Sequence, residues 1–160
     1  MTSESDQQRF MRRAIALARL HMEAGEGGPF GAVVVKDGHI IGEGWNRVTS
    51  SHDPTAHAEV TAIRAACLAR GTFELRGCEI YTSCEPCPMC LAAIYWARLD
   101  RIWYANLCSD AAAIQFDDDW LYREVALPLE QRSLAALPLL REEALAVFRD
   151  WEAKADKVPY

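Results

Sequence analysis

Two short segments that lie far apart in the sequence restrict what this chain can fold into. They read TAHAEV at residues 55–60 and SCEPCPMC at residues 83–90. Between them they hold one imidazole, two closely spaced thiols and one carboxylate, at His57, Cys87, Cys90 and Glu59. Three ligands of the imidazole and thiol type are typical of a catalytic zinc site, which keeps its fourth position for water or substrate. The fold must therefore bring the two segments to one point.

Both segments are predicted to begin helices, over residues 55–69 and 88–97. Pro88 suits the first helical position, where a missing backbone N–H costs nothing. Cys87 and Cys90 then adjoin on the first turn, where the positive end of the helix dipole favours thiolates. The second segment is thus predicted to hold a metal ion with two thiolates from one helical turn.

The first segment supplies one ligand and one acid–base group. His57 and Glu59 are two residues apart and do not share a side of a helix, so we expect Glu59 to reach a water molecule while His57 binds the metal. A Cys-x-x-Cys pair alone also suits a redox pair or half of a structural zinc site. A structural site needs a fourth ligand, which Cys84 or His52 could supply. Catalysis is favoured because a structural site leaves the His-x-Glu element unexplained.

The hydrophobic pattern predicts one α/β domain with a mixed sheet and helices on both faces. The remaining expected helices cover residues 8–23 and 141–155, and the expected strands cover residues 30–35, 40–46, 78–82 and 101–105. The first two strands flank an Asp-Gly turn, which indicates a β-hairpin. The last two enclose a helix, which indicates a right-handed parallel crossover.

Composition narrows the class of protein. The 160 residues carry a net charge of -6, which disfavours broad binding to nucleic acid and favours a small neutral substrate. No apolar run reaches the ~20 residues that span a membrane, and the polar first ten residues do not resemble a signal peptide, so we expect a cytoplasmic protein. Six cysteines in such a chain do not indicate a disulfide framework. We expect three of them to be buried apolar residues: Cys67, Cys78 and Cys108.

At the two motifs the chain resembles the cytidine deaminase superfamily and, within it, the short bacterial guanine deaminases. His-x-Glu followed by Pro-Cys-x-x-Cys is the signature of zinc-dependent nucleobase deaminases. The resemblance covers most of the chain and includes residues 27–33, 46, 53–63, 81–98, 116–118 and 160. It implies a three-layer α/β/α cytidine deaminase-like fold with a mixed five-stranded sheet. It also implies a zinc deaminase catalytic core over residues 1–126 and a C-terminal helical extension and tail over residues 127–160, within a single domain overall.

The resemblance implies a hydrolase that converts guanine to xanthine and ammonia, with one Zn²⁺ per subunit. His57, Cys87 and Cys90 would bind the zinc, and Glu59 would carry protons between water, a ring nitrogen and the departing amine. The implied substrate-binding residues are Asn46, Phe30, Ala56, Trp96, Asp118 and Tyr160. The implied assembly is a homodimer with a swapped C-terminal segment, whose tail closes the site of the partner chain.

Four of the implied substrate-binding residues also have an ordinary structural interpretation. Asn46 could simply end its strand, and Trp96 could be a core residue of an apolar helix. Asp118 could belong to a solvated acidic turn, and Tyr160 could be a frayed terminus. Glu142 and Glu143 lie in the C-terminal extension, which would act as a lid over the site. They are further candidate proton carriers, although their sequence context indicates no more than an acidic helix.

Three rival functions stay open from the sequence. A tRNA adenosine deaminase would share the zinc motif and fold but should carry a basic groove for the flanking nucleotides. A cytosine or triazine deaminase would differ mainly in the residues that contact the base. A non-catalytic zinc-binding protein could retain the scaffold, although the intact Glu59 weighs against it.

Overall fold

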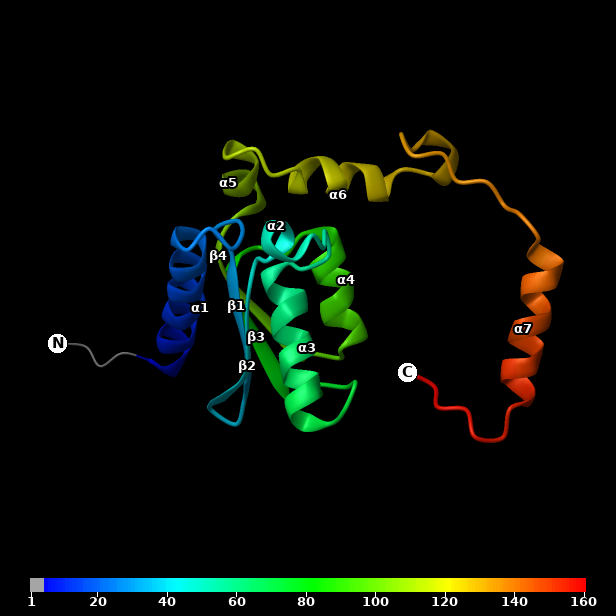
Figure 1. Cartoon of the computed structure of the whole chain (residues 1–160), viewed down its shortest axis with the longest axis horizontal. Helices are drawn as coiled ribbons and strands as arrows, with labels where there is room; N and C mark the ends of the chain where they lie inside the picture. The colour runs from blue at the N-terminus through cyan, green and yellow to red at the C-terminus, as the bar shows by residue number, and fades with distance from the viewer. Residues whose placement is uncertain (1–4) are drawn as a thin grey trace. The chain divides into compact units, whose positions relative to one another are not determined.

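The computed structural model of the chain describes residues 5–160 (Figure 1). These residues divide into two compact units, 5–122 and 123–160. The boundary between the units lies within α6, before the predicted boundary at residue 126. The elements that lie in or begin in the first unit are α1 (Asp6–Glu23), β1 (Gly31–Lys36), β2 (His39–Trp45), α2 (Val48–Ser51), α3 (Ala58–Arg70), β3 (Cys78–Cys84), α4 (Pro88–Trp96), β4 (Arg101–Asn106), α5 (Cys108–Ala113) and α6 (Asp118–Ala126).

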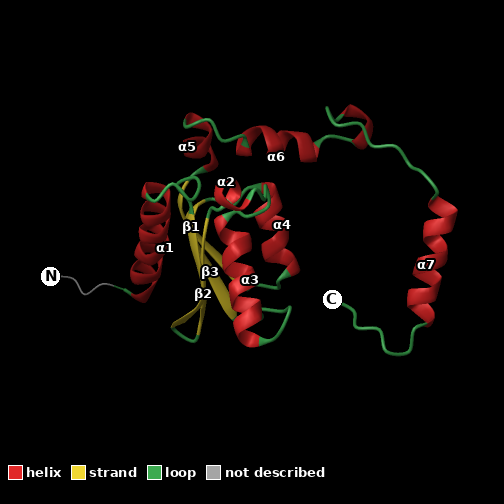
Figure 2. Cartoon of the chain, in the orientation of Figure 1, coloured by secondary structure: helices red, strands yellow, loops and turns green. Residues whose placement is uncertain are grey.

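A mixed sheet with the strand order β2-β1-β3-β4 forms the centre of the first unit (Figure 2). Strand β1 pairs antiparallel with both β2 and β3, so the predicted hairpin is confirmed. Strand β3 pairs parallel with β4 across the α4 connection, which confirms the predicted crossover. The central position of β1 explains its apolar run, because five of its six residues are buried.

The expected five-stranded sheet is not what the described residues form, since they contain four strands in one sheet. After β4 the chain enters the short helix α5 instead of a further strand. The Asp110 carboxylate accepts a hydrogen bond from the Leu107 backbone N–H at 2.8 Å and so begins this helix. Three alanines at 111–113, which favour helix, follow it.

The sheet separates two apolar clusters, which gives the three layers (Figure 2). Side chains alternate along β1, so that Val33 and Val35 pack on the side of α1 and Ala32 and Val34 on the side of α3. The first cluster comprises the buried residues Phe10, Leu17, Val33, Val35 and Tyr81. The second comprises Ala32, Val34, Ala58, Ala62, Ala66, Leu75, Cys78, Ile80, Ile94 and Ala97.

Helix α3 lies against the backbone of β2 because small residues face each other there. A Cβ atom on Gly44 would lie 2.2 Å from the Ala58 carbonyl oxygen and 2.3 Å from the Ala62 nitrogen. Gly42 meets the next turn of the helix in the same way. Contact with β2 therefore fixes the distance between the N-terminal half of α3 and the sheet, and the position of this half along the strand.

The sequence predicted that helix α3 begins at Thr55. In the structure it begins at Ala58. The Asp53 side chain accepts hydrogen bonds from both the backbone N–H and the hydroxyl of Thr55, at 2.8 and 2.7 Å. These bonds form a local turn that competes with helix. As a result His57 is the N-cap residue, with extended φ and ψ, and Glu59 lies in the first turn.

The second unit contains the 3-10 turn η1 (Leu129–Gln131) and helix α7 (Arg141–Ala153), which confirms the final predicted helix apart from its last two residues. Many of its apolar side chains are exposed, among them Leu134, Leu137, Leu139 and Phe148. Throughout residues 5–160, no helix combines the length and apolar character needed to cross a membrane.

The packing of α3 on β2 predicts that the substitution Gly44→Ala lowers the free energy of unfolding by about 3 kcal/mol, because the added methyl group meets backbone atoms that cannot move independently. Urea titration measures this change. Gly38→Ala is the matched control, since Gly38 has open space around its Cβ position and a φ of 74°. The control should cost only about 1 kcal/mol for that backbone conformation. Equal losses in the two variants would refute the close packing.

Candidate metal and substrate site

Two helix N-termini meet at the candidate metal site. His57 is the N-cap residue of α3, and Cys87 is the N-cap residue of α4. Pro88 occupies the first helical position of α4, as predicted, and Cys90 lies in its first turn. Neither N-cap side chain makes a side-chain capping hydrogen bond. The positive ends of both helix dipoles favour negatively charged sulfur at this point.

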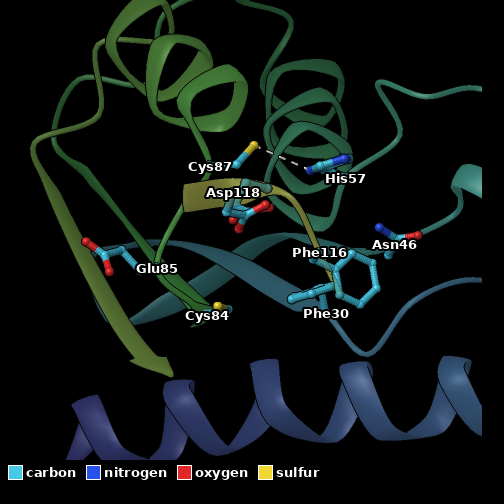
Figure 3. Close-up of a pocket in the computed structure, with 9 residues that line it drawn as sticks. Phe30, Asn46, His57, Cys84, Glu85, Cys87, Phe116 and Asp118 are labelled. Atoms are coloured by element: carbon cyan, nitrogen blue, oxygen red, sulfur yellow. Dashed lines mark hydrogen bonds between the residues drawn. The ribbon is translucent and has the colours of Figure 1, made fainter. Parts of the chain in front are cut away.

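The ligand atoms of His57, Cys87 and Cys90 all lie within 4.8 Å of one another. The His57 Nδ1 and Cys87 Sγ atoms are 3.6 Å apart (Figure 3). A tetrahedral zinc ion with typical Zn–N and Zn–S bonds places such a pair about 3.6 Å apart. The donor set and its spacing therefore fit zinc, and the group among residues 5–160 has three members. The proposed fourth ligands, Cys84 and His52, are not part of it.

The two thiols affect the ionisation of each other in opposite directions. The Cys90 thiol and the His57 imidazole hydrogen bond to Cys87 and lower the pKa of its thiol, while the Cys87 thiolate and burial raise the pKa of Cys90. The same Cys87 thiolate raises the pKa of His57 above its usual value. Binding of a divalent cation would replace these protons, because metal ligands must be deprotonated.

Glu59 is a buried carboxyl group beside this centre. Its side chain comes from the first turn of α3, and its residue is 6% exposed. The Thr82 hydroxyl of β3 donates a hydrogen bond to Glu59 Oε1 at 3.2 Å and orients the carboxylate. Burial raises the pKa of Glu59 above its ordinary value. A buried carboxyl group beside a reacting centre can serve as a general acid and base.

A pocket opens from this centre and is lined by aromatic, polar and acidic side chains (Figure 3). Phe30 and Phe116 meet edge to face, with their ring centroids 4.8 Å apart, and form its apolar wall. The lining residues are Phe30, Asn46, His57, Glu59, Cys84, Glu85, Cys87, Phe116 and Asp118.

Asn46 presents a donor to the pocket because its acceptor is already occupied. Its Oδ1 atom accepts hydrogen bonds from the backbone N–H groups of Gly28 at 3.1 Å and Val48 at 3.2 Å. These two bonds settle which end of the amide is the oxygen. The Nδ2 group therefore points toward the pocket (Figure 3). A ligand here must offer an acceptor to Asn46.

Asp118 lies across the same pocket, in the first turn of α6. Burial is the largest cause that raises the pKa of its carboxyl group, followed by the charge of Cys87. The neighbouring Asp117 and Asp119 are not among the lining residues. In its ionised form Asp118 accepts hydrogen bonds. A ligand here would therefore have to offer a donor to Asp118 and an acceptor to Asn46.

Three of the predicted substrate-binding residues lie outside the pocket lining. Ala56 is buried beside His57, and its carbonyl oxygen accepts a hydrogen bond from the Arg47 N–H at 2.9 Å. Trp96 is 60% exposed at the end of α4, and Tyr160 is 75% exposed in the second unit.

Phe116 and Glu85 line the pocket although the sequence predicted no role for either of them. Phe116 stands two residues before Asp118, and that spacing was the available signal. Cys84, which the sequence offered only as a possible fourth metal ligand, also lines the pocket. Cys84 is the last residue of β3, and Glu85 follows it on the way to the Cys-x-x-Cys motif. Burial raises the pKa of the Cys84 thiol to about 12, so this residue acts as a neutral part of the pocket floor.

Comparison with known proteins agrees with this geometry. Over residues 4–106 the chain matches the family described as cytidine and deoxycytidylate deaminase zinc-binding region. Guanine deaminase from Bacillus subtilis (strain 168) is 53% identical over 94% of this chain and 97% of that protein. A tRNA-specific adenosine deaminase from Agrobacterium fabrum (strain C58) is 44% identical over 66% of this chain and 69% of that protein.

A solved structure extends the comparison to three dimensions. The X-ray structure of guanine deaminase from Bacillus subtilis superimposes with a TM-score of 0.92 and 52% sequence identity. The superposition covers 96% of this chain and 98% of that one. The likeness therefore includes the C-terminal segment as well as the zinc-binding region.

The ligand group predicts that Cys87→Ser abolishes tight zinc binding, because a hydroxyl group does not ionise to replace the lost thiolate. Cys84→Ser is the matched control, since Cys84 is also buried and lines the pocket but lies outside the ligand group. It should bind one zinc ion like the unsubstituted protein. Zinc content after gel filtration, with competition by a chromophoric chelator, measures both. Loss of zinc from the Cys84 variant alone would contradict the assignment.

Proposed function

This chain belongs to the cytidine and deoxycytidylate deaminase family, and on that basis we propose that it hydrolyses guanine to xanthine and ammonia with the help of a bound zinc ion. The observation that carries the proposal is the identity of 53% to a guanine deaminase over 94% of the chain. The pocket supports it, since a proton carrier, a three-ligand metal group and a pair of complementary polar side chains surround one space.

His57, Cys87 and Cys90 would hold the zinc ion. When bound at such a site, zinc lowers the pKa of a water molecule and so supplies a nucleophile at neutral pH. Glu59 accepts a proton as water adds to the carbon that bears the amino group. It passes this proton to a ring nitrogen. It then takes the proton of the newly added hydroxyl group as the carbonyl forms and delivers it to the amine, which leaves as ammonia when the C–N bond breaks. The Thr82 hydroxyl keeps one carboxylate oxygen of Glu59 in place through these transfers.

Guanine fits the polar groups of the pocket because it carries both acceptors and donors at its edges. The Asn46 Nδ2 group would donate to a ring nitrogen or carbonyl oxygen, and the Asp118 carboxylate would accept from ring N–H or amino groups. Phe30 and Phe116 would cover the flat ring. Pairing of this kind rejects a base that lacks a matching group, since a buried partner would then stay unbonded.

We further propose a homodimer in which the C-terminal segment of each chain closes the site of the other. The exposed apolar side chains of the second unit support this, because large exposed apolar surfaces mark interaction sites. Tyr160 and Trp96 would then contact a site completed by two chains. We propose one zinc ion per subunit, which the single ligand group found among residues 5–160 supports. Six cysteines without a disulfide in the structure suit the reducing cytoplasm, and nucleic acid and membranes are not expected partners.

A substrate panel tests the proposed reaction. Zinc-loaded protein should release ammonia from guanine, and much more slowly or not at all from adenine, cytosine, a triazine, guanosine or a tRNA anticodon stem-loop. Release from the stem-loop or from cytosine but not from guanine would replace the proposal with a rival deaminase. No release from any substrate would favour a non-catalytic zinc-binding protein.

Glu59→Gln should lower kcat for guanine by roughly 10²- to 10⁴-fold, because the amide cannot carry the proton. Its zinc content should match that of the unsubstituted protein, since Glu59 is not a ligand in the three-residue group. Steady-state kinetics and metal analysis of the same sample measure both quantities. Full turnover by this variant would refute the role of Glu59.

The tail is tested by deleting Tyr160, which should reduce kcat/KM for guanine about tenfold, as expected for one lost contact to the substrate complex. The urea midpoint should not change, because Tyr160 is largely exposed. Co-expression with the Glu59→Gln variant then tests the swap. In mixed dimers the intact tail of the Glu59→Gln chain would close the site of the truncated chain and restore turnover. Mixed dimers without such recovery would refute the swapped arrangement.

A further inference from the structure

A carboxylate outside the pocket joins three elements next to Asn46. Glu26, in the loop after α1, receives a hydrogen bond from the Trp45 indole N–H at Oε2, at 2.7 Å. Its other oxygen, Oε1, lies 3.1 Å from His21 Nδ1 in the last turn of α1. Its backbone oxygen accepts bonds from Ser50 and Thr49 of α2, both at 3.4 Å. One residue therefore links α1, the end of β2 and α2.

The rings on either side of this carboxylate are held as a pair. His21 stacks on Trp45 with ring centroids 3.6 Å apart and an angle of 4° between the planes. The two N–H groups lower the pKa of Glu26, so the carboxyl group is an acceptor only. His21 then donates from Nδ1. The two donors meet separate oxygens of the Glu26 carboxylate and together orient it.

The same loop holds the acceptor end of Asn46. Glu26 is followed by Gly27 and Gly28, and the Gly28 N–H is one of the two donors to Asn46 Oδ1. Gly27 lies so close that a Cβ atom on it would be 2.1 Å from the Asn46 carbonyl oxygen and 2.5 Å from Oδ1. Trp45, the indole partner of Glu26, directly precedes Asn46 in the chain. Glu26 thus constrains both the loop that donates to Asn46 and the strand end that carries it.

We propose that Glu26 is a positioning residue for substrate binding, which acts by holding the Gly28 N–H and the end of β2 so that the Asn46 amide keeps its Nδ2 group toward the pocket. This role rests on the proposed function in one respect, which is that Asn46 contacts the base. Glu26 itself lines no part of the pocket. Loss of its carboxylate frees the loop and lets the amide of Asn46 rotate or withdraw.

The chain provides a matched control in Glu43. This residue also ties α1 to β2, because its carboxylate accepts two bonds from Arg13, at 2.7 and 2.6 Å. Glu43 and Glu26 have similar exposure, with 32% and 36% of their side-chain surfaces accessible. Glu43 has no bond to the loop or to Asn46. A general loosening of α1 from the sheet would affect both variants, whereas positioning of Asn46 involves Glu26 alone.

Kinetics with guanine separate these effects. Glu26→Ala should raise KM about tenfold, the loss expected when one substrate hydrogen bond is misplaced, and leave kcat and zinc content unchanged. Glu26→Gln should lie between, because its single amide oxygen can accept from only one of the two N–H groups. Glu43→Ala should match the unsubstituted protein. An unchanged KM in Glu26→Ala, an equal change in Glu43→Ala, or a fall in kcat together with zinc loss would each overturn the proposal.

A second measurement decides the same question without turnover. The side-chain amide of Asn46 gives a pair of nitrogen-correlated NMR signals, identified by their loss in Asn46→Asp. These signals should shift or broaden in Glu26→Ala and stay in place in Glu43→Ala. Unmoved signals in Glu26→Ala would overturn the positioning role. If the unsubstituted protein released no ammonia from guanine, the proposed function would fail while the NMR result still decided the role of Glu26.

Discussion

The approach of His57 Nδ1 to Cys87 Sγ, at 3.6 Å, is the contact on which the rest of the site depends. It joins two helix N-termini that are set by different parts of the sheet. Helix α3 is placed by its backbone contact with Gly44 of β2, and α4 by the short crossover between the parallel strands β3 and β4. Because each helix is fixed near its start, small errors in either packing would separate the ligands. The geometry of the pocket therefore depends on how the two helices pack on the sheet.

The electrostatics of the pocket point to a cation at this contact. Glu59 and Asp118 both have a raised pKa because they are buried, and the charge of Cys87 adds to the effect in each. The Cys87 thiolate likewise raises the pKa of Cys90. Burial and the Cys87 charge thus disfavour the ionised forms of Glu59, Asp118 and Cys90. A divalent ion on the three ligands would neutralise the thiolates and lower the cost of an ionised carboxylate beside them. The burial of these groups and the binding of a cation would therefore support each other.

Local patterns in the sequence predicted four of the helices, the hairpin and the parallel pairing across α4, because each depends on spacing within one short segment. The ligand group was predicted from two such segments taken together. Helices α2, α5 and α6 were not predicted. The misses came from contacts that the spacing does not encode. Helix α3 starts later than expected because the Asp53 side chain forms a turn with Thr55. The fifth strand came from resemblance, whereas Asp110 and three alanines direct that segment into helix. Phe116 and not Trp96 contacts Phe30. The sequence did not predict this contact, because it does not give the path by which the loop after α5 returns to the pocket. The direction of the Asn46 amide depends on Gly28, which is distant in sequence.

The residues proposed for the reaction all lie in the family's zinc-binding region, whereas only some of those proposed to contact the base lie there. The match to the family's zinc-binding region ends at residue 106, and it contains the three ligands, Glu59 and Asn46. Phe116 and Asp118 follow that limit but still line the pocket. The similarity to the tRNA-specific adenosine deaminase covers 66% of the chain, whereas that to the guanine deaminase covers 94%. A scaffold of this kind can keep one hydrolytic centre and exchange the segment that follows β4. Selection of the base would then change through a few side chains, while the helix ends that hold the metal stay where the sheet places them.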